Sequence, residues 1–171
     1  RLTPDQRTSA SLQARELLEE QSLWQNAGSI FFYAPLPGEL DVWPLVQDSV
    51  AAGKLVCLPR FEPAAQRYIA CRVKDLSTDI SPGRFGVREP ASHCVTVPLN
   101  QLDLILVPGV AFDPRGNRLG RGKGFYDRLL ADTSGIRCGV AFDEQIVTEI
   151  PVEPHDIPMH CILTPTRWIR L

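Results

Sequence analysis

Short apolar runs alternate with amphipathic segments along most of this chain, and this alternation constrains the fold more than any other feature. Nearly unbroken apolar runs occupy residues 29–34, 55–59 and 102–107. Such runs are typical of strands that are buried on both faces of a sheet. Before the first run and between the first two, apolar residues recur at helical spacing, within 10–23 and 42–50. Strands that alternate with helices predict right-handed βαβ units and a mostly parallel sheet.

The two helical segments have recognisable ends. The first begins with Thr3-Pro4-Asp5-Gln6, in which Thr3 can cap the helix, Pro4 suits the first helical position and Gln6 completes a capping box. Its apolar face continues to about Leu23. The second segment stops at Gly53, because glycine favours the end of a helix.

We therefore expect a single-domain α/β fold over residues 1–171, a three-layer αβα sandwich with a mostly parallel, Rossmann-like sheet. A chain of 171 residues can bury roughly 70% of its unfolded surface, and no repeat or linker indicates a second domain. Because the chain begins at Arg1 without Met, we expect residues upstream of it to be missing. The remaining pattern predicts an edge strand at 68–73, an irregular segment at 79–98, a helix at 125–130, a strand at 137–142, a short helix at 144–148, a strand at 161–164 and an exposed tail.

Charge and cysteine content narrow the classes of partner. A net charge of −2 argues against nonspecific electrostatic binding to nucleic acid or anionic lipid. No apolar run approaches the ~18 residues of a membrane span. The odd number of cysteines without a C-x-x-C pair favours ordinary buried thiols in a reducing compartment. We expect a monomeric, cytoplasmic protein with a small-molecule partner and with neither nucleic acid nor membrane. The cysteines are Cys57, Cys71, Cys94, Cys138 and Cys161.

A glycine-rich, basic stretch from Val107 to Asp132 follows the clearest buried strand. It interleaves Gly116, Gly120, Gly122 and Gly124 with Arg118, Arg121 and Lys123, and then enters a helix near Phe125. Glycines let backbone N–H groups approach an anion, basic side chains neutralise it, and a helix N-terminus adds partial positive charge. Ligands of parallel sheets sit beyond the carboxyl ends of the strands. The stretch therefore predicts a phosphate site.

Two familiar phosphate motifs do not fit this stretch. A Walker A loop needs Ser or Thr after Gly122-Lys123, where Gly124 stands, and a dinucleotide fingerprint needs its glycines directly after the strand. A flexible glycine loop with solvated cations remains an alternative. It does not explain why three cations share six residues, since they repel each other unless an anion lies between them.

The whole ordered string identifies the chain more closely than any single glycine motif. It consists of Pro108-Gly109, Ala111-Phe112-Asp113, Gly116-Asn117-Arg118-Leu119-Gly120, Gly122-Lys123-Gly124 and Phe125-Tyr126-Asp127. Distant segments add Pro37-Gly38-Glu39-Leu40-Asp41, Gly86, Glu89-Pro90, Pro151, His155-Asp156 and Thr164-Pro165. This sequence resembles the 5-formyltetrahydrofolate cyclo-ligase family, also called methenyltetrahydrofolate synthetase, over nearly the whole chain.

The resemblance implies an enzyme that closes 5-formyltetrahydrofolate to 5,10-methenyltetrahydrofolate with ATP and Mg²⁺, releasing ADP and phosphate. The formyl oxygen takes the γ-phosphoryl group, N10 attacks the resulting iminium phosphate, and phosphate leaves. The folate substrate can carry a polyglutamate tail. Phosphoryl transfer asks a protein mainly to position groups and to spread negative charge, which suits a glycine-rich basic loop.

The resemblance also implies roles by position. Arg121, Lys123 and Tyr126 are the expected catalytic residues. The expected ATP-binding residues are Arg118, Leu119, Gly120, Arg121, Gly122, Lys123, Gly124, Phe125 and Tyr126. The expected folate-binding residues are Glu39, against the pterin ring, with Phe85, Arg121, Gly122, Lys123 and Tyr126. Asp127 and Asp156 match the magnesium positions.

The residues taken alone leave other roles open. Tyr126 could be an aromatic that faces the core, and Phe85 an anchor for a Pro- and Gly-rich loop. Asp127 and Glu39 could be acids at helix starts that favour the helix dipole. Asp156, without the resemblance, is only a loop carboxylate.

Departures from the family pattern keep a second function open. Val42 replaces a common Thr, and Phe125 replaces the first member of a common Tyr-Tyr pair. A basic cluster that contacts ATP in the family would lie upstream of Arg1. Its absence is consistent with a non-catalytic ATP- or folate-binding member of the family. A sugar-phosphate isomerase or transferase would need a general base that the three histidines, His93, His155 and His160, do not convincingly supply.

Overall fold

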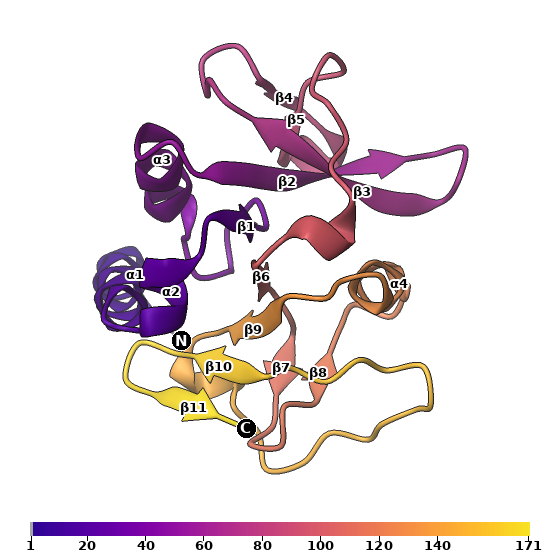
Figure 1. Cartoon of the computed structure of the whole chain (residues 1–171). Coiled ribbons are helices and arrows are strands. Elements are labelled where there is room, and N and C mark those ends of the chain that lie inside the picture. The colour runs from indigo at the N-terminus through magenta and orange to yellow at the C-terminus, as the bar shows by residue number, and fades with distance from the viewer. Residues whose placement is uncertain (1) are drawn as a thin grey trace.

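One mostly parallel sheet forms the centre of the molecule (Figure 1). The structure is a computed structural model that describes residues 2–171, apart from the side chain of Phe85. The strand order is β11-β10-β9-β6-β1-β2-β3, and only the edge strands β3 and β11 pair antiparallel with their neighbours. The strands are β1 (Ser29–Phe31), β2 (Leu55–Glu62), β3 (Arg67–Val73), β6 (Leu104–Val107), β9 (Ile136–Val140), β10 (Cys161–Leu163) and β11 (Trp168–Arg170). The predicted α/β class, its mostly parallel sheet and the edge strand at 68–73 are confirmed.

Helices cover both faces of this sheet. Figure 1 shows α1 (Pro4–Glu19), α2 (Ser22–Asn26) and α3 (Trp43–Ala51) on one side and α4 (Phe125–Ala131) on the other. Consecutive strand residues point to opposite sides, so the buried strands feed two apolar clusters. Ile30, Leu104 and Leu106 pack in the cluster under α1 and α3, whereas Phe31, Ile105 and Val107 pack in the cluster with Leu129 and Leu130 of α4. This arrangement confirms the predicted three-layer sandwich.

The first helix begins as predicted but ends earlier. The Thr3 hydroxyl accepts a hydrogen bond from the Gln6 N–H at 3.1 Å, and the Gln6 side chain accepts one from the Thr3 N–H at 2.8 Å. The expectation of one helix to about Leu23 is wrong, because Gln21 is extended and separates α1 from α2. The break allows Trp24 to pack edge-on against Phe32.

Three short segments differ from the sequence-based expectation. Residues 79–98 contain an antiparallel hairpin, β4 (Ile80–Pro82) and β5 (Arg88–Pro90), with η1 (Arg84–Gly86) at its tip, and are followed by η2 (Leu99–Gln101). The helix expected at 144–148 is a single 3₁₀ turn, η3 (Asp143–Gln145). The expected exposed tail forms β11, whose half-buried Trp168 and Ile169 pack on the two apolar clusters. Strands of three residues are too short to show an alternating pattern in the sequence.

A further hairpin lies inside the glycine-rich stretch. β7 (Ala111–Phe112) pairs antiparallel with β8 (Arg118–Leu119), and this sheet was not predicted. The hairpin fixes the course of the chain between β6 and the basic residues that precede α4.

Two expectations from composition also have structural counterparts. All five cysteines are free and buried, which confirms the expectation that they are buried thiols without disulfides. Within residues 2–171, none of the helices combines the length and the apolar character that crossing a membrane requires.

Gly116 and Gly53 provide a test of how tightly the turn between β7 and β8 is packed. Both have a left-handed backbone, with φ of +91° and +78°, but a Cβ at Gly116 would lie 2.5 Å from Leu171 Cδ1 and 2.7 Å from the Met159 oxygen. A Cβ at Gly53 would meet nothing within 4 Å. Left-handed backbone costs roughly 1–2 kcal/mol in either alanine variant. Gly116→Ala should lose roughly a further 1–3 kcal/mol from overpacking, measured as the free energy of unfolding in urea. Equal losses in the two variants would contradict this packing.

Candidate active site

The candidate site lies where the strand order reverses. β1 and β6 are parallel neighbours, but the chain continues from β1 to β2 on one side and from β6 to β9 on the other. The loops that follow β1 and β6 therefore leave the same edge of the sheet in opposite directions, which creates the crevice where open α/β sheets bind ligands. Arg121 Nη2 of one loop lies 3.9 Å from Glu39 Oε2 of the other. The two sequence-predicted segments thus meet in space.

Glu39 is held in a fixed position at this crevice. One of its carboxylate oxygens accepts a hydrogen bond from the Leu36 N–H at 2.8 Å, and the other faces Arg121. The buried Tyr33 hydroxyl fastens the same turn by donating to the Leu40 carbonyl at 2.8 Å. The side chain is only 11% exposed, and this burial raises the pKa of Glu39, against the opposing effects of the Leu36 hydrogen bond and Arg121.

Arg118 is a buried cation at the end of the β7–β8 hairpin. Its side chain is 7% exposed, Nη1 donates to the Pro108 carbonyl at 3.0 Å, and Nη2 lies 3.8 Å from Asp127 Oδ1. Its guanidinium also stacks on the Tyr126 ring at 5.3 Å. Burial lowers the pKa of Arg118, and Asp127, Tyr126 and Asp156 oppose that effect. An arginine in such surroundings keeps its charge. Its buried Nε has no hydrogen-bond partner among the described residues.

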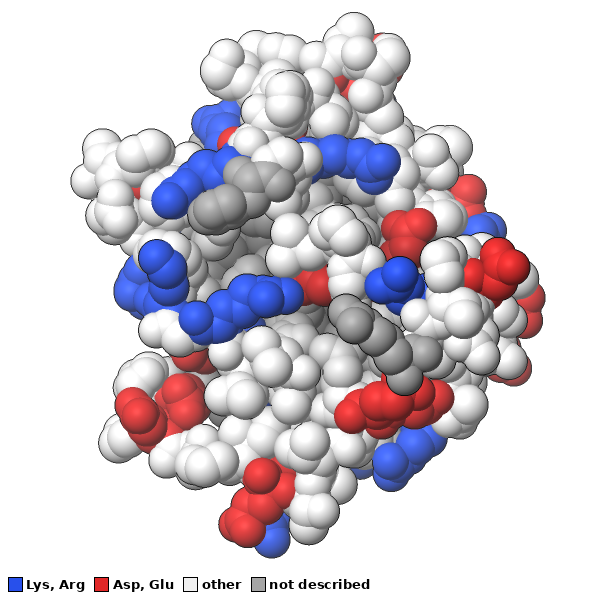
Figure 2. All heavy atoms as spheres, turned by 180° about the vertical axis from the view of Figure 1, so that it is seen from behind, with Lys and Arg blue, Asp and Glu red and all other residues white. Residues whose placement is uncertain are grey.

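The remaining basic residues of the loop are open to solvent. Arg121, Gly122 and Lys123 are exposed. Figure 2 shows a hollow in the face opposite to that of Figure 1, with Lys and Arg side chains gathered around it. The backbone is left-handed at Gly122 and Gly124, with φ of +91° and +69°, a conformation that glycine adopts without steric cost. A loop of this kind can present several cationic groups to one anion.

Gly116 does not share in that loop. Its N–H donates to the Asp113 carbonyl, and its own carbonyl accepts from the Met159 N–H at 2.8 Å. The expectation that all four glycines serve the anion is therefore wrong at Gly116, which shapes the hairpin turn instead. Gly120 lies closer to the cations, since a Cβ there would lie 3.2 Å from the Arg118 guanidinium nitrogens. Leu119 carries a half-exposed side chain and pairs with Ala111 through its backbone.

Aromatic residues form one wall beside the loop. Phe125 packs edge-on against Phe61 and Tyr68, with ring centroids 5.2 Å and 5.7 Å away, and Tyr126 lies 6.0 Å from Tyr68. Tyr126 packs on this wall and on the apolar cluster, so it is an aromatic residue that faces the core, and it also contacts Arg118. Its contact with folate stays a prediction. Burial, with a contribution from Glu39, raises the pKa of Tyr126, so its phenol stays neutral. The sequence analysis did not assign Phe61 and Tyr68 to the site. Two aromatic residues that flank the turn at 62–67 could have indicated that they pair across neighbouring strands.

Two carboxylates and a histidine converge beside Arg118. One ligand atom each of Asp127, His155 and Asp156 lies within 4.8 Å of the other two. Asp156 Oδ2 accepts from the Glu153 N–H at 2.8 Å, and its Oδ1 faces His155 Nε2 at 3.5 Å. The structure thus brings the two predicted metal residues together and adds His155, which the sequence analysis did not assign to a metal. Hard oxygen donors of this kind suit Mg²⁺.

Asp113 is a positioning residue that the sequence analysis quoted without giving it a role. Its buried carboxylate accepts hydrogen bonds from the N–H groups of Arg115, Asn117 and Ile150 and from the Asn117 side chain, at 3.0–3.1 Å. Burial alone would raise the pKa of Asp113, but these hydrogen bonds outweigh it and lower that pKa. The carboxylate ties the β7–β8 turn to the segment that leads to Asp156. The predicted folate contact Phe85 lies in η1, and its side chain is outside the described part of the chain.

Comparison with known proteins gives a consistent result along the whole chain. Residues 1–165 match the 5-formyltetrahydrofolate cyclo-ligase family. The chain is 34% identical to the 5-formyltetrahydrofolate cyclo-ligase of Escherichia coli K12, over 97% of this chain and 93% of that protein. It is 36% identical to the Haemophilus influenzae protein of the same name, over 91% and 83% of the two chains. The NMR structure of Aquifex aeolicus 5,10-methenyltetrahydrofolate synthetase superimposes with a TM-score of 0.89 at 32% identity, covering 99% of this chain and 84% of that one.

The role of Asp113 can be tested through the pH dependence of stability. Asp113→Asn should lose about 2 kcal/mol of unfolding free energy at pH 7, because it removes the charge from several buried hydrogen bonds. A carboxyl whose folded pKa is lowered stabilises the protein above its unfolded pKa of about 3.9, and this contribution disappears as the pH falls through the folded pKa. The difference between wild type and variant in urea denaturation should therefore shrink below about pH 4. The exposed Asp132→Asn serves as control, and a difference that does not depend on pH would contradict the assignment.

Proposed function

The chain belongs to the 5-formyltetrahydrofolate cyclo-ligase family, and from this membership we propose that it cyclises 5-formyltetrahydrofolate to 5,10-methenyltetrahydrofolate. Family membership implies ATP as the co-substrate. We further propose that the reaction needs Mg²⁺ and releases ADP and phosphate. The main observation behind this proposal is the Arg121–Glu39 contact, which shows that the loops following β1 and β6 meet. The proposed reaction requires this arrangement, because it must hold a triphosphate and a pterin side by side.

The proposed reaction proceeds in two steps. The formyl oxygen attacks the γ-phosphorus, and the bond to ADP breaks. N10 then attacks the formyl carbon of this iminium phosphate, the carbon–oxygen bond breaks, phosphate leaves with the former formyl oxygen, and N10 loses its proton. Negative charge moves during both steps, so the protein contributes chiefly through fixed positive charge and orientation.

The basic loop suits the phosphate side of this reaction. Arg118 is buried and fixed, with an unpartnered Nε among the described residues, and can act as a permanent cation at the base of the site. Arg121 and Lys123 are exposed and can close on an anion from the solvent side. Backbone N–H groups between Arg118 and Tyr126 add donors that need no side chain. We assign the triphosphate to this loop and the catalytic electrostatic roles to Arg121 and Lys123.

The other wall of the crevice suits the pterin side. Glu39 offers a fixed carboxylate, which can accept the adjacent N–H groups of a pterin edge. Arg121 faces this carboxylate, so a cation of the phosphate loop already borders the proposed pterin site. Tyr126, a neutral phenol between Arg118 and the aromatic wall, can orient the folate ring. We therefore place Glu39, Phe85, Arg121, Gly122, Lys123 and Tyr126 around the folate.

The Mg²⁺ requirement rests on the donor set beside the loop. Asp127 and Asp156 supply hard oxygen ligands next to Arg118, on the side where the triphosphate is assigned. Mg²⁺ in such sites is held by one or two carboxylates together with phosphate oxygens. Bound there, the ion would neutralise part of the triphosphate charge, while Arg118 keeps the two carboxylates from repelling each other.

The assay that tests this function combines the full chain with 5-formyltetrahydrofolate, ATP and Mg²⁺. We expect methenyltetrahydrofolate absorbance to rise together with an equimolar release of phosphate, and both to stop when a chelator removes the metal. Calorimetric binding of ATP or folate without turnover would instead support a non-catalytic member of the family. Absence of both binding and turnover would contradict either function.

Arg121→Ala tests the electrostatic role of the loop. Loss of one preorganised charge that stabilises a transition state lowers turnover by about 10²-fold. The matched control is Arg115→Ala, because Arg115 is also an exposed arginine of the same stretch but pairs with the exposed Glu149 on the hairpin turn. We expect kcat to fall in the first variant and to stay near the wild-type value in the second. Similar kcat values in both variants would contradict the assignment.

A further inference from the structure

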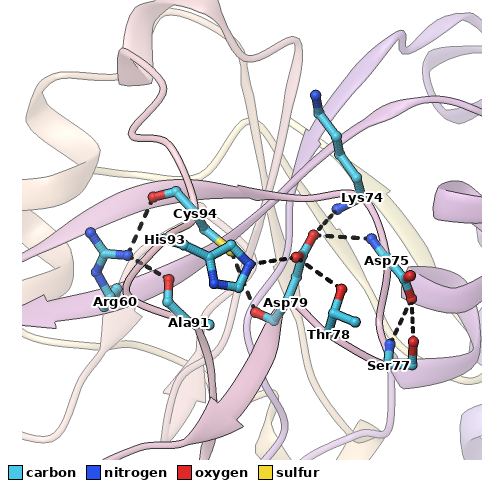
Figure 3. Close-up of polar contacts among 9 residues, drawn as sticks. All are labelled: Arg60, Lys74, Asp75, Ser77, Thr78, Asp79, Ala91, His93 and Cys94. Atoms are coloured by element: carbon cyan, nitrogen blue, oxygen red, sulfur yellow. Dashed lines mark hydrogen bonds and ion pairs between the residues drawn. The ribbon is translucent and has the colours of Figure 1, made fainter.

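A second group of metal-ligating side chains lies outside the candidate active site, at the base of the β4–β5 hairpin. Asp79 directly precedes β4, and His93 and Cys94 lie in the turn that follows β5. One ligand atom from each residue lies within 4.8 Å of the other two. Figure 3 shows the His93 ring and the Cys94 sulfur directed toward Asp79. An oxygen, a nitrogen and a sulfur donor from two separate segments thus converge on one point.

Asp79 is fixed in an orientation that leaves one oxygen for the group. Its Oδ2 accepts hydrogen bonds from the N–H groups of Lys74 and Asp75, at 2.8 Å and 3.0 Å. Its Oδ1 faces His93 Nε2 at 2.8 Å and accepts a longer bond of 3.3 Å from the Thr78 hydroxyl. The Asp79 side chain is 13% exposed. Backbone donors that orient a carboxylate are the support that metal-ligating oxygens usually have.

The turn that carries His93 and Cys94 is fixed as well. The Cys94 N–H donates to the Ala91 carbonyl at 2.9 Å, and Arg60 Nη1 donates to the carbonyls of Ala91 and Cys94 at 2.9 Å and 3.4 Å. The Ala91 N–H in turn donates to the Asp79 carbonyl at 2.7 Å. The Cys94 thiol makes one long contact, 3.5 Å to the same Asp79 carbonyl. Both segments therefore hold their donors in place.

We propose that Asp79 Oδ1, His93 Nε2 and Cys94 Sγ form a zinc-binding site. Mixed sulfur, nitrogen and oxygen donors select Zn²⁺ over Mg²⁺ or Ca²⁺, which prefer oxygen alone. The aspartate and a Cys94 thiolate together balance the charge of the ion, and the thiol proton passes to solvent on binding. Water can take the fourth tetrahedral position.

The movement that zinc requires of His93 and Asp79 relative to each other is small. Tetrahedral bonds of about 2.0–2.1 Å to nitrogen and oxygen place those two atoms roughly 3.3 Å apart. His93 Nε2 and Asp79 Oδ1 lie 2.8 Å apart, so they need to separate by a few tenths of an ångström. The His93 side chain is 62% exposed and can make this shift without disturbing the core.

The ion would fasten the base of the hairpin whose tip is η1. At that tip, the Arg84 guanidinium stacks on the Phe61 ring at 4.4 Å, and Phe61 packs against Phe125 at the start of α4. Zinc bound by Asp79 would therefore stabilise the aromatic wall that contains Phe61, beside the candidate active site. Its ligands differ from those that we assign to Mg²⁺.

Cobalt(II) titration of the metal-free full chain tests the site, because a thiolate–cobalt charge-transfer band reports sulfur coordination. We expect this band at one equivalent of Co²⁺ and its loss when Zn²⁺ competes. Cys94→Ser should abolish the band, and His93→Gln should weaken binding by roughly tenfold or more, since even loss of a residue that supports a ligand costs 10–100-fold. Asp127→Asn with Asp156→Asn is the control and should keep the band, because that group contains no sulfur.

Two results would overturn the proposal. One is the absence of a charge-transfer band at one equivalent in the wild-type chain, and the other is a band that persists in Cys94→Ser. If Cys94→Ser does not fold, the exposed His93 decides the question. An unchanged cobalt affinity in His93→Gln would then rule the site out.

Discussion

The parallel pairing of β1 with β6 is the constraint on which the candidate site depends. The register Ile30 with Leu104 and Phe31 with Ile105 places the carboxyl ends of both strands side by side. Because the chain turns away in opposite directions from these two ends, the segment containing Glu39 and the glycine-rich loop face each other across a crevice. The buried strands keep this geometry rigid, and the variable chemistry is left to the loops.

Charge balance explains how so many cations can share this crevice. Arg118 lies 3.8 Å from Asp127, and Arg121 lies 3.9 Å from Glu39. Both separations exceed the 2.7–3.2 Å of a good hydrogen bond, so the carboxylates neutralise the guanidinium groups without using their directional donors. Apart from Arg118 Nη1, which donates to the Pro108 carbonyl, these donors would remain for the phosphate that we propose. The same carboxylates are the groups that we assign to Mg²⁺ and to the pterin ring, so each ligand would take over an existing partner of a cation.

The sequence predicted what depends on local patterns and missed what depends on tertiary contacts. The buried run at 102–107 and the capping box at Thr3 are local signals, and both elements formed. The β7–β8 hairpin and β11 are too short to leave a periodic pattern. Asp156 was placed only through a family resemblance, because nothing in the residues around it shows that it lies beside Asp127. The sequence analysis gave Asp113 no role, because only the fold brings the Ile150 N–H to its carboxylate.

A double-mutant cycle between Glu39 and Arg121 most directly tests the central claim that the two loops form one site. The measurement is kcat/KM for Glu39→Gln, Arg121→Ala and the double variant, with 5-formyltetrahydrofolate and ATP. Residues in contact within one site show coupling energies of roughly 0.5–3 kcal/mol. We predict that the two losses are not additive and differ from their sum by at least about 0.5 kcal/mol. Strictly additive losses would mean that the two loops act independently, which would contradict the account.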